Sequence, residues 1–324
     1  MKATAFAPSN IAFIKYWGKK DEALRIPENG SISMNLSGMT TKTMVEFSSH
    51  YQADEVVIDG KIIPQPDRIT AHLNRIRDMA GFRNRAKVVS GNSFPAGTGL
   101  SSSASGFAAL TVAGAEAAGL RLSEKELSML ARQGSGSACR SVPDGFTEWL
   151  GGDSDDTSYA VSLYPPEHWD IVDIVAVVTQ DPKEIPTTEG MKGLRKSPFS
   201  GVRLSDMDRK IAFCKKLIKA RDFCQLGELV ESEALEMHAV MITQIPALLY
   251  WTTGTLRIMN LVQAWRREGL PVYFTINTGQ NIHILTLPET EAEIGKRLHS
   301  LRYVRDVISN HPTSGTRLVT GHLF

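Results

Sequence analysis

The chain has 324 residues, 42% of them hydrophobic and 22% charged, which is ordinary for a globular protein and sufficient for two medium-sized domains. A formal net charge of +1 gives no indication of nucleic acid or an anionic membrane as a main partner. No apolar run approaches the roughly 20 residues needed to span a bilayer, and the amino-terminal segment lacks a signal-peptide core. Three cysteines, with no paired Cys or His motif, indicate a reducing cytoplasm and no metal site built from the protein's own residues.

The first half of the chain predicts alternating strands and helices. Asp59-Gly60 is typical of a tight hairpin turn, because these residue types tolerate positive φ. Ser123 is followed three positions later by Glu126, the pattern of a helix-capping box. We expect strands over residues 3–16, 40–48 and 86–90, a hairpin over 55–63, and helices over 67–80, 107–118 and 123–133.

The second half predicts a strong strand, a polar stretch, several helices and two further strands. The apolar residues of 205–245 recur at helical spacing. Because residues 180–200 are polar and rich in Pro, Thr, Gly and Lys, we expect a domain boundary there, with domains over 1–182 and 183–324. The expected elements are strands over 170–179, 271–276, 282–285 and 304–308, and helices within 205–245 and over 251–267 and 289–301.

A Gly/Ser-rich stretch, FPAGTGLSSSASG over residues 94–106, separates a predicted strand from a predicted helix. Glycines let backbone N–H groups turn toward a ligand, and the first helical turn adds free N–H groups and partial positive charge. Serine hydroxyls add hydrogen bonds to phosphate or to a metal ion bound with it. The stretch therefore predicts a phosphate-binding loop, and the alternative is a flexible turn before a buried helix.

Two cations stand out from their surroundings. Lys15 directly follows the apolar run 11–14, so burial and an anionic ligand both act on it, whereas Lys19 and Lys20 taken alone are typical of a solvated turn. Arg140 closes a second Gly/Ser cluster, residues 134–139, and its fork of donors suits carboxylate or phosphate. The alternative for this arginine is a structural ion pair with Asp144 or Glu148.

Taken together, five motifs in this order resemble the mevalonate diphosphate decarboxylases of the GHMP kinase superfamily. They are NIAFIKYWGK over residues 10–19, the loop 95–105, SGSACR over 135–140, EMHAV over 236–240, and the turn 273–281. The common phosphate loop GxxxxGK[ST] is absent, in agreement with the different Gly/Ser loop of that superfamily. The resemblance implies an α+β GHMP kinase fold, with an N-terminal ribosomal-protein-like domain, a C-terminal ferredoxin-like domain and an active site in the cleft between them.

The resemblance also implies a reaction. ATP phosphorylates the tertiary C3 hydroxyl of a 5-phosphorylated mevalonate, the new phosphate leaves, carbon dioxide is lost, and an isopentenyl phosphate or diphosphate forms. Phosphorylation is required because a tertiary alcohol is a poor leaving group. The implied cofactors are ATP and Mg²⁺, and the implied partner is a small phosphorylated mevalonate. Since relatives are often homodimers, we also expect a homodimer.

Individual residues are assigned by their match to the family motifs. His238 is expected to be a structural helix histidine. The implied catalytic residues are Lys15, Arg140 and Asn277, and the implied substrate-binding residues are Asn10, Tyr16, Lys19, Ser135, Ser137 and Arg140. The implied contacts to ATP are Gly97, Gly99, Ser101, Ser102, Ser103 and Ser105, above all Ser102 and Ser103.

One position departs from the family at the reacting centre, because Asn277 stands where the family has an aspartate that acts on the C3 hydroxyl. Asparagine keeps the shape but cannot accept the proton. An engineered knockout, a natural variant that does not need the base, and a relative with a changed reaction each explain the departure. The single isosteric change favours the knockout, for which Asn277→Asp is expected to raise turnover by orders of magnitude.

Other departures concern the substrate. Residues 142–146 (VPDGF) replace a Gly-Gly-Phe pattern, and Glu189 stands where a cation or hydroxyl would better suit a diphosphate. Fewer cations at the 5-end favour mevalonate 5-phosphate as substrate and isopentenyl phosphate as product. The alternatives are a mevalonate 5-diphosphate decarboxylase, a mevalonate 3,5-bisphosphate decarboxylase, a small-molecule kinase, and a catalytically silent metabolite-binding protein.

Overall fold

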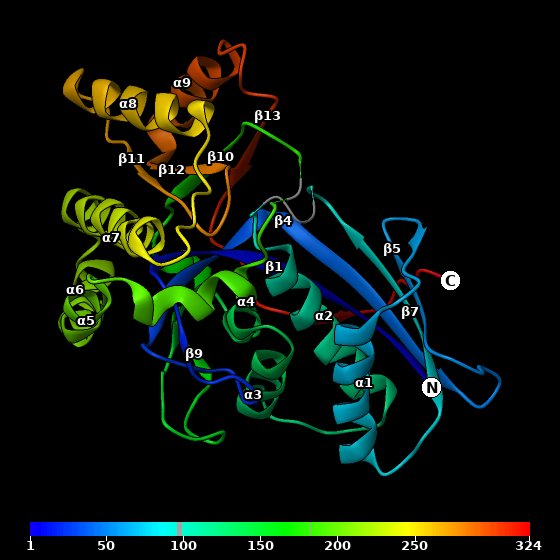
Figure 1. Ribbon diagram of the computed structural model, residues 1–324. Coiled ribbons are helices and arrows are strands. Elements are labelled where there is room, and N and C mark those ends of the chain that lie inside the picture. Colours follow the sequence, from blue (N-terminus) through cyan, green and yellow to red (C-terminus); the bar gives the residue numbers. More distant parts are fainter. Residues whose placement is uncertain (96–98, 182) are drawn as a thin grey trace.

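The computed structural model of the protein describes residues 1–95, 99–181 and 183–324. In this described part, eight strands form the larger of two main sheets, in the order β14-β1-β4-β7-β5-β6, with β8 pairing to β4 and β9 to β8 (Figure 1). The strands are β1 (Lys2–Ile14), β4 (Ser31–Ser48), β5 (Glu55–Ile58), β6 (Lys61–Ile62), β7 (Arg85–Asn92), β8 (Phe146–Trp149), β9 (Ala160–Tyr164) and β14 (Arg317–Val319).

The antiparallel pair β1 and β4 forms the long axis of this sheet, with a register from Lys2 opposite Glu46 to Ile14 opposite Ile32. The register shifts between Pro8 and Ser9, where proline offers no N–H to the ladder. The sequence predicted only the second half of β4. In its first half Ser31, Ser33 and Asn35 alternate with fully buried apolar residues, and this mixture conceals a strand that is buried on both faces.

Three helices cover one face of the larger sheet (Figure 1): α1 (Asp67–Ala80), α2 (Ser102–Ala117) and α3 (Glu124–Gly134). Alanines of α2 and β1 share one core with apolar residues of α1 and α3. Gly114 lets α1 approach α2, because a Cβ there would lie 2.6 Å from Ile76 Cδ1. The capping box predicted for Ser123 and Glu126 is confirmed at the start of α3.

On the opposite face, α6 (Met207–Ala220) and α7 (Phe223–Thr243) enclose a second core with Phe13, Met34 and Leu36 of the sheet. Three short helical segments precede them, α4 (Thr187–Gly190), η3 (Met191–Lys196) and α5 (Ser200–Ser205). The first two lie within residues 180–200, the polar stretch in which the sequence predicted a domain boundary, and α5 begins at its end.

The smaller sheet has the order β11-β12-β10-β13, and helices α8 (Thr253–Arg267) and α9 (Pro288–His299) cover its outer face. Its strands are β10 (Val172–Val177), β11 (Tyr273–Thr275), β12 (Ile282–Thr286) and β13 (Asp306–Asn310). The expected division at residues 182–183 lies after β10, whereas backbone pairing places β10 in this second sheet and returns β14 to the first.

Four small elements complete the described chain: β2 (Lys19–Asp21), β3 (Ile26–Pro27), η1 (Gly136–Ser141) and η2 (Pro166–His168). The β2–β3 pair and η1 were not predicted, and both lie beside the candidate site. None of the helices in the described ranges has the length and apolar character that a membrane span requires.

Candidate functional site

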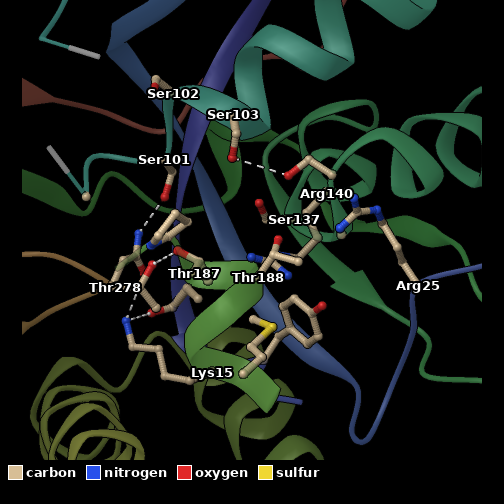
Figure 2. A pocket seen from close by; sticks show the side chains of 18 of the residues that line it. Lys15, Arg25, Ser101, Ser102, Ser103, Ser137, Arg140, Thr187, Thr188 and Thr278 are labelled. Carbon is tan, nitrogen blue, oxygen red and sulfur yellow. Dashed lines mark hydrogen bonds between the residues drawn. The ribbon is translucent and has the colours of Figure 1, made fainter. Parts of the chain in front are cut away.

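A cavity of about 350 Å³ lies where elements of the two sheets meet. Residues at the end of β1, the start of α2 and the α3–η1 junction line it from the first sheet. The turn between β11 and β12, the segment around α4, and Met237 of α7 line it from the other side. Figure 2 shows Ser101 and Thr278 on one side of this cavity and Arg25 on the other. The volume suits a small organic ligand.

The Gly/Ser loop turns into α2 at this cavity. Ser101 has φ 60°, a left-handed conformation, and α2 begins at the next residue, so the free N–H groups of its first turn adjoin the lining serines. Ser103 Oγ lies 3.2 Å from Ser135 Oγ, which joins the two Gly/Ser clusters (Figure 2). This hydroxyl-rich helix start can hold phosphate.

Four of the six expected ATP contacts line the cavity: Gly99, Ser101, Ser102 and Ser103. Ser105 does not, because its side chain is fully buried and its Oγ lies 2.7 Å from Thr41 Oγ1, on the sheet side of α2. We therefore correct the role expected of Ser105 to one of packing. Gly97 lies outside the described residues.

Arg140 is a buried cation whose partners are all neutral. It is 3% exposed, and its guanidinium donates to Ser33 Oγ at 3.0 Å, Ser31 Oγ at 2.7 Å and Asn10 Oδ1 at 3.1 Å. Burial is the main cause that lowers its pKa. The two acids considered as structural partners bind elsewhere: Asp144 to Arg317, and Glu148 to Lys215. The arrangement is suited to an anionic ligand.

Lys15 is the second buried cation of the site, 1% exposed. Its Nζ donates to the carbonyl oxygen of Ala12 at 2.7 Å and to Asn277 Oδ1 at 3.2 Å. Burial is the main cause that lowers its pKa to about 7. Its backbone is fixed, since the N–H donates to Glu233 Oε2 at 2.9 Å and the carbonyl accepts from Arg203 at 3.0 Å.

The turn that carries Asn277 joins the smaller sheet to the Gly/Ser loop. Asn277 Nδ2 donates to Ser101 Oγ at 2.9 Å, and its carbonyl oxygen accepts from His238 Nε2 at 3.0 Å. Burial lowers the pKa of His238 to about 3, so the imidazole is neutral and holds the turn. Beside it, Lys183 donates to the carbonyl oxygen of Thr278 at 2.9 Å, and burial lowers the pKa of Lys183 to about 8.

The residues expected at the substrate divide into two groups. Tyr16, Ser135 and Ser137 line the cavity. Asn10 lies behind Arg140, which it orients through Oδ1 while its Nδ2 donates to Ser141 Oγ at 2.8 Å, so it positions the arginine and does not line the cavity. Lys19 is not among the lining residues either and pairs with Glu22.

Sequence reasoning missed two arginines of the cavity, Arg25 and Arg68. Arg25 has φ 54°, a left-handed conformation that is uncommon outside glycine, and its Nε donates to the carbonyl oxygen of Gln133 at 3.0 Å. Arg68 donates to the next carbonyl, of Gly134, at 3.2 Å. The two guanidinium groups thus meet at the end of α3, beside Ser135. Neither arginine stands in a motif, so the sequence carried no signal for them. Sequence reasoning also missed six other lining residues: Lys183, Thr187, Thr188, Met191, Met237 and Thr278.

A second cavity, of about 190 Å³, adjoins the Gly/Ser loop. Ser102 and Ser103 line both cavities. Its walls are otherwise mainly apolar, with Thr43, Ser90 and Asn92 as polar exceptions. The apolar lining residues are Ile58, Ile69, Val88, Phe107 and Leu110. A flat, mostly apolar group attached to a bound phosphate chain would fit there.

A Gly/Ser loop at a helix start, beside two buried basic side chains in a cavity between two sheets, is suited to phosphoryl transfer. Comparison with known proteins identifies the family. The model of the diphosphomevalonate decarboxylase-like N-terminal domain matches residues 7–160, and that of the mevalonate 5-diphosphate decarboxylase C-terminal domain matches residues 173–317.

Known relatives agree with these family models. The diphosphomevalonate decarboxylase of Candida albicans is 34% identical over 86% of this chain and 82% of its own. The phosphomevalonate decarboxylase of Haloferax volcanii is 35% identical over 89% of both chains. The solved complex of MDDEF with MVAPP, AMPPCP and magnesium superposes with a TM-score of 0.93, at 36% identity over 99% of both chains. The chain therefore belongs to the mevalonate diphosphate decarboxylase family of ATP-dependent carboxy-lyases.

The expected fold and cofactors, ATP and Mg²⁺, are confirmed by this membership. The residues around the loop fit a magnesium ion that is bound mainly through substrate phosphates. No cluster of three His, Cys, Asp or Glu side chains suited to a metal occurs in the part of the chain that the structure describes. Mg²⁺ retains water and is commonly bound through substrate phosphates, and the hydroxyls of Ser102 and Ser103 would complete its surroundings.

Proposed function

We propose that the protein catalyses the ATP-dependent decarboxylation of mevalonate 5-phosphate to isopentenyl phosphate, through phosphorylation at C3. The observation that carries this proposal is the pair of buried basic side chains at the loop. Arg140 and Lys15 both lack an ion pair among the described residues, and both lie beside the Ser101–Ser103 loop. A buried cation without a counter-ion is costly unless a ligand supplies the negative charge.

The residues divide the chemistry between them. Arg140 holds the substrate carboxylate, the loop and the start of α2 hold the phosphates of ATP, and Lys15 lies at the C3 hydroxyl. The hydroxyl oxygen bonds to the γ-phosphorus as the bond to ADP breaks. The C3–O bond then breaks with release of phosphate, and the electrons of the C–CO₂ bond form the alkene. Mg²⁺ screens the phosphate charges when it is bound.

Charge at the other end of the cavity supports a monophosphate. Within the described residues Arg25 and Arg68 have no acidic partner, and together they supply two positive charges beside Ser135. A phosphate monoester carries a charge of about −1.5 to −2 at pH 7, which these two charges match. Glu189 adds no positive charge and pairs with Lys192 at 2.7 Å outside the cavity. The Haloferax relative is named for the monophosphate reaction.

Two findings favour the alternative substrate, mevalonate 5-diphosphate. The Candida relative is named for that reaction, and the solved complex contains MVAPP. The same residues would perform the same chemistry, with a longer anionic group at the end of the cavity where Arg25 lies. In both cases the second cavity, beside Ser102 and Ser103, would hold the base of ATP.

The test is a coupled assay with ATP and Mg²⁺ that follows ADP and carbon dioxide separately, with mevalonate 5-phosphate, mevalonate 5-diphosphate and mevalonate 3,5-bisphosphate. We expect mevalonate 5-phosphate to give the highest kcat/KM, with one ADP per carbon dioxide. A preference for the diphosphate would overturn the substrate assignment. Formation of ADP without carbon dioxide would indicate a small-molecule kinase. Release of carbon dioxide from mevalonate 3,5-bisphosphate without ATP would indicate a mevalonate 3,5-bisphosphate decarboxylase. Asn277→Asp, assayed in parallel, shows whether Asn277 inactivates the chain.

A further inference from the structure

The amine of Lys15 lies in an environment that disfavours its charge. Glu233, the carboxylate that accepts from the Lys15 backbone N–H, also accepts from Arg203 at 3.0 Å and from Lys210 at 3.1 Å. Asp173 is bound by His283 Nδ1 at 3.0 Å. Neither forms an ion pair with Lys15 Nζ in the described part of the chain, so the amine has no counter-ion of its own.

Charges of both signs face this amine from the surrounding elements. Glu233 and Asp173 favour the ammonium form, and Arg140 and Arg203 oppose it; His238, which is neutral, lies on the same helix as Glu233. Burial outweighs all of these and brings the pKa of Lys15 to about 7. A substantial fraction of the side chain is therefore a neutral amine near neutral pH.

The hydrogen bonds of Lys15 fit the neutral amine. A neutral amine has two N–H donors and one lone pair. Nζ has two acceptors, the carbonyl oxygen of Ala12 at 2.7 Å and Asn277 Oδ1 at 3.2 Å. With both N–H groups used, the lone pair occupies the remaining tetrahedral position, on a side chain that lines the cavity.

We infer that Lys15 is the proton acceptor for the C3 hydroxyl in this chain and replaces the carboxylate that the family has at position 277; this inference rests on the proposed function. As the C3 oxygen bonds to the γ-phosphorus, its O–H bond breaks and the proton moves to the lone pair of Nζ. The bond from phosphorus to ADP breaks in the same step. The ammonium then stays beside the 3-phosphate that departs, and returns its proton to water after product release.

The identity of residue 277 decides which group acts as the base. A carboxylate in place of Asn277 would lie close to Nζ, hold Lys15 as an ammonium and itself accept the proton. Asparagine keeps the bond to Ser101 and still accepts from Nζ, but it leaves the lysine free to lose its charge. If Asn277 is natural, the chain therefore still has a group that can accept the proton of the C3 hydroxyl.

A pH profile of kcat/KM, which reports the ionisable groups of the free enzyme, tests this assignment. With ATP, Mg²⁺ and the preferred substrate, kcat/KM of the wild type should fall tenfold per pH unit below about pH 7, because the base becomes protonated. In Asn277→Asp the acidic limb should shift to below about pH 5, since a carboxylate then accepts the proton. A wild-type rate that stays level from pH 8 to pH 5.5 would overturn the inference.

Lys15→Arg separates a base from a fixed charge, since arginine stays protonated. In the wild-type background we expect a loss of about a hundred- to ten-thousandfold in kcat, the contribution of a general base. In the Asn277→Asp background the loss should be much smaller, because only a cation is then needed. Equal losses in both backgrounds would contradict the assignment.

NMR titration of the ligand-free protein, labelled with [ε-¹³C]lysine, gives a readout without turnover. The signal that disappears in Lys15→Arg should titrate near pH 7 in the wild type and above pH 9 in Asn277→Asp. A wild-type value above 9 would overturn the inference. If Asn277→Asp releases carbon dioxide and the wild type does not, the role of Lys15 as base is overturned and the family reaction stands. If neither protein releases carbon dioxide, the proposed function is wrong.

Discussion

Three neutral side chains hold the guanidinium of Arg140, and their neutrality is what keeps its charge available. Ser31, Ser33 and Asn10 supply hydrogen bonds without cancelling the charge. A carboxylate in any of these positions would compete with an anionic ligand for the same donors. The folded protein therefore keeps an uncompensated buried charge, which destabilises it until an anion binds.

We expect Arg140→Met to lower kcat/KM by about a hundred- to a thousandfold, the cost of losing one partner of a buried charge pair. The Tm should not fall, because an unpaired buried charge is removed. Arg132→Met is the matched control, since Arg132 is equally buried but is paired with Asp155 and lies outside the cavity. Steady-state kinetics and thermal unfolding check both variants. A Tm that falls as far in Arg140→Met as in Arg132→Met would contradict this account.

Single residues were predictable where they stood in motifs. Lys15, Arg140 and Asn277 are brought together by the fold, as the family motifs implied. Arg25 and Arg68 were not found, because each is isolated in the sequence and reaches the cavity only through the packing of a short hairpin and of α1 on the end of α3. Ser105 was misjudged since helical geometry turns it away from Ser101–Ser103 toward the sheet.

Among the elements, the Gly/Ser loop and the turn after β11 depend on a close backbone contact. Gly99 has φ 89°, and a Cβ there would lie 2.4 Å from the Cα of Gly279. Both the conformation and the contact exclude a side chain. The Gly/Ser loop is thereby held against the turn that carries Asn277.

Gly99→Ala should weaken binding of AMPPCP with Mg²⁺ at least about tenfold, since a positive φ and a backbone clash each cost on the order of 1 kcal/mol or more. Isothermal titration calorimetry measures this affinity. Gly295→Ala is the control, because Gly295 lies within α9 with no atom near its added Cβ, and alanine there should stabilise the helix by about 1 kcal/mol. Unchanged affinity in Gly99→Ala would show that the contact does not shape the loop.

Elements with a clear hydrophobic periodicity were predicted well. Elements whose polar residues face the site instead of water were not. Helices α1, α3 and α8 begin and end close to their predicted limits. The first half of β4 was missed because its polar residues hold Arg140 and Pro143 instead of facing water. The segment η1, which carries Arg140, is too short and irregular for any periodic signal.

At the scale of the whole molecule, the carboxyl-terminal residues add an edge strand, β14, to the first sheet. After the second sheet, β14 pairs with β1, Thr4 opposite Val319, and both termini lie at one end of the larger sheet (Figure 1). Thr316 bonds to the carbonyl oxygen of Ser141 through its N–H at 3.0 Å and its hydroxyl at 2.7 Å. These bonds fix the residue next to Arg140.

Deleting residues 316–324 should lower the Tm by several degrees, because it removes β14, the Thr316 bonds and the ion pair of Arg317 with Asp144. It should also lower kcat/KM about tenfold or more, through looser support of Arg140. Deletion of residues 320–324, which keeps β14, is the matched control and should behave nearly as the full chain. Differential scanning calorimetry and kinetics compare the two, and equal Tm values would refute the role given to β14.

The α+β architecture was predictable from the family motifs, but the return of the chain to the first sheet as β14 was not. Arg317–Val319 is a strand of three residues, and so short a segment has no alternation to recognise. The assignment of β10 to the second sheet was also beyond reach, because a buried strand reads the same in either sheet.

The pairing of β14 with β1 also has a consequence for how the protein is made. A ribosome releases the amino-terminal strand first, yet the strand that covers Thr4, Ala5 and Phe6 is synthesised more than 300 residues later. Throughout translation this edge of β1 remains an open template for pairing with other chains. Cells that overproduce the protein should therefore depend on chaperones that shield nascent chains, and fragments that end before β14 should collect in inclusion bodies.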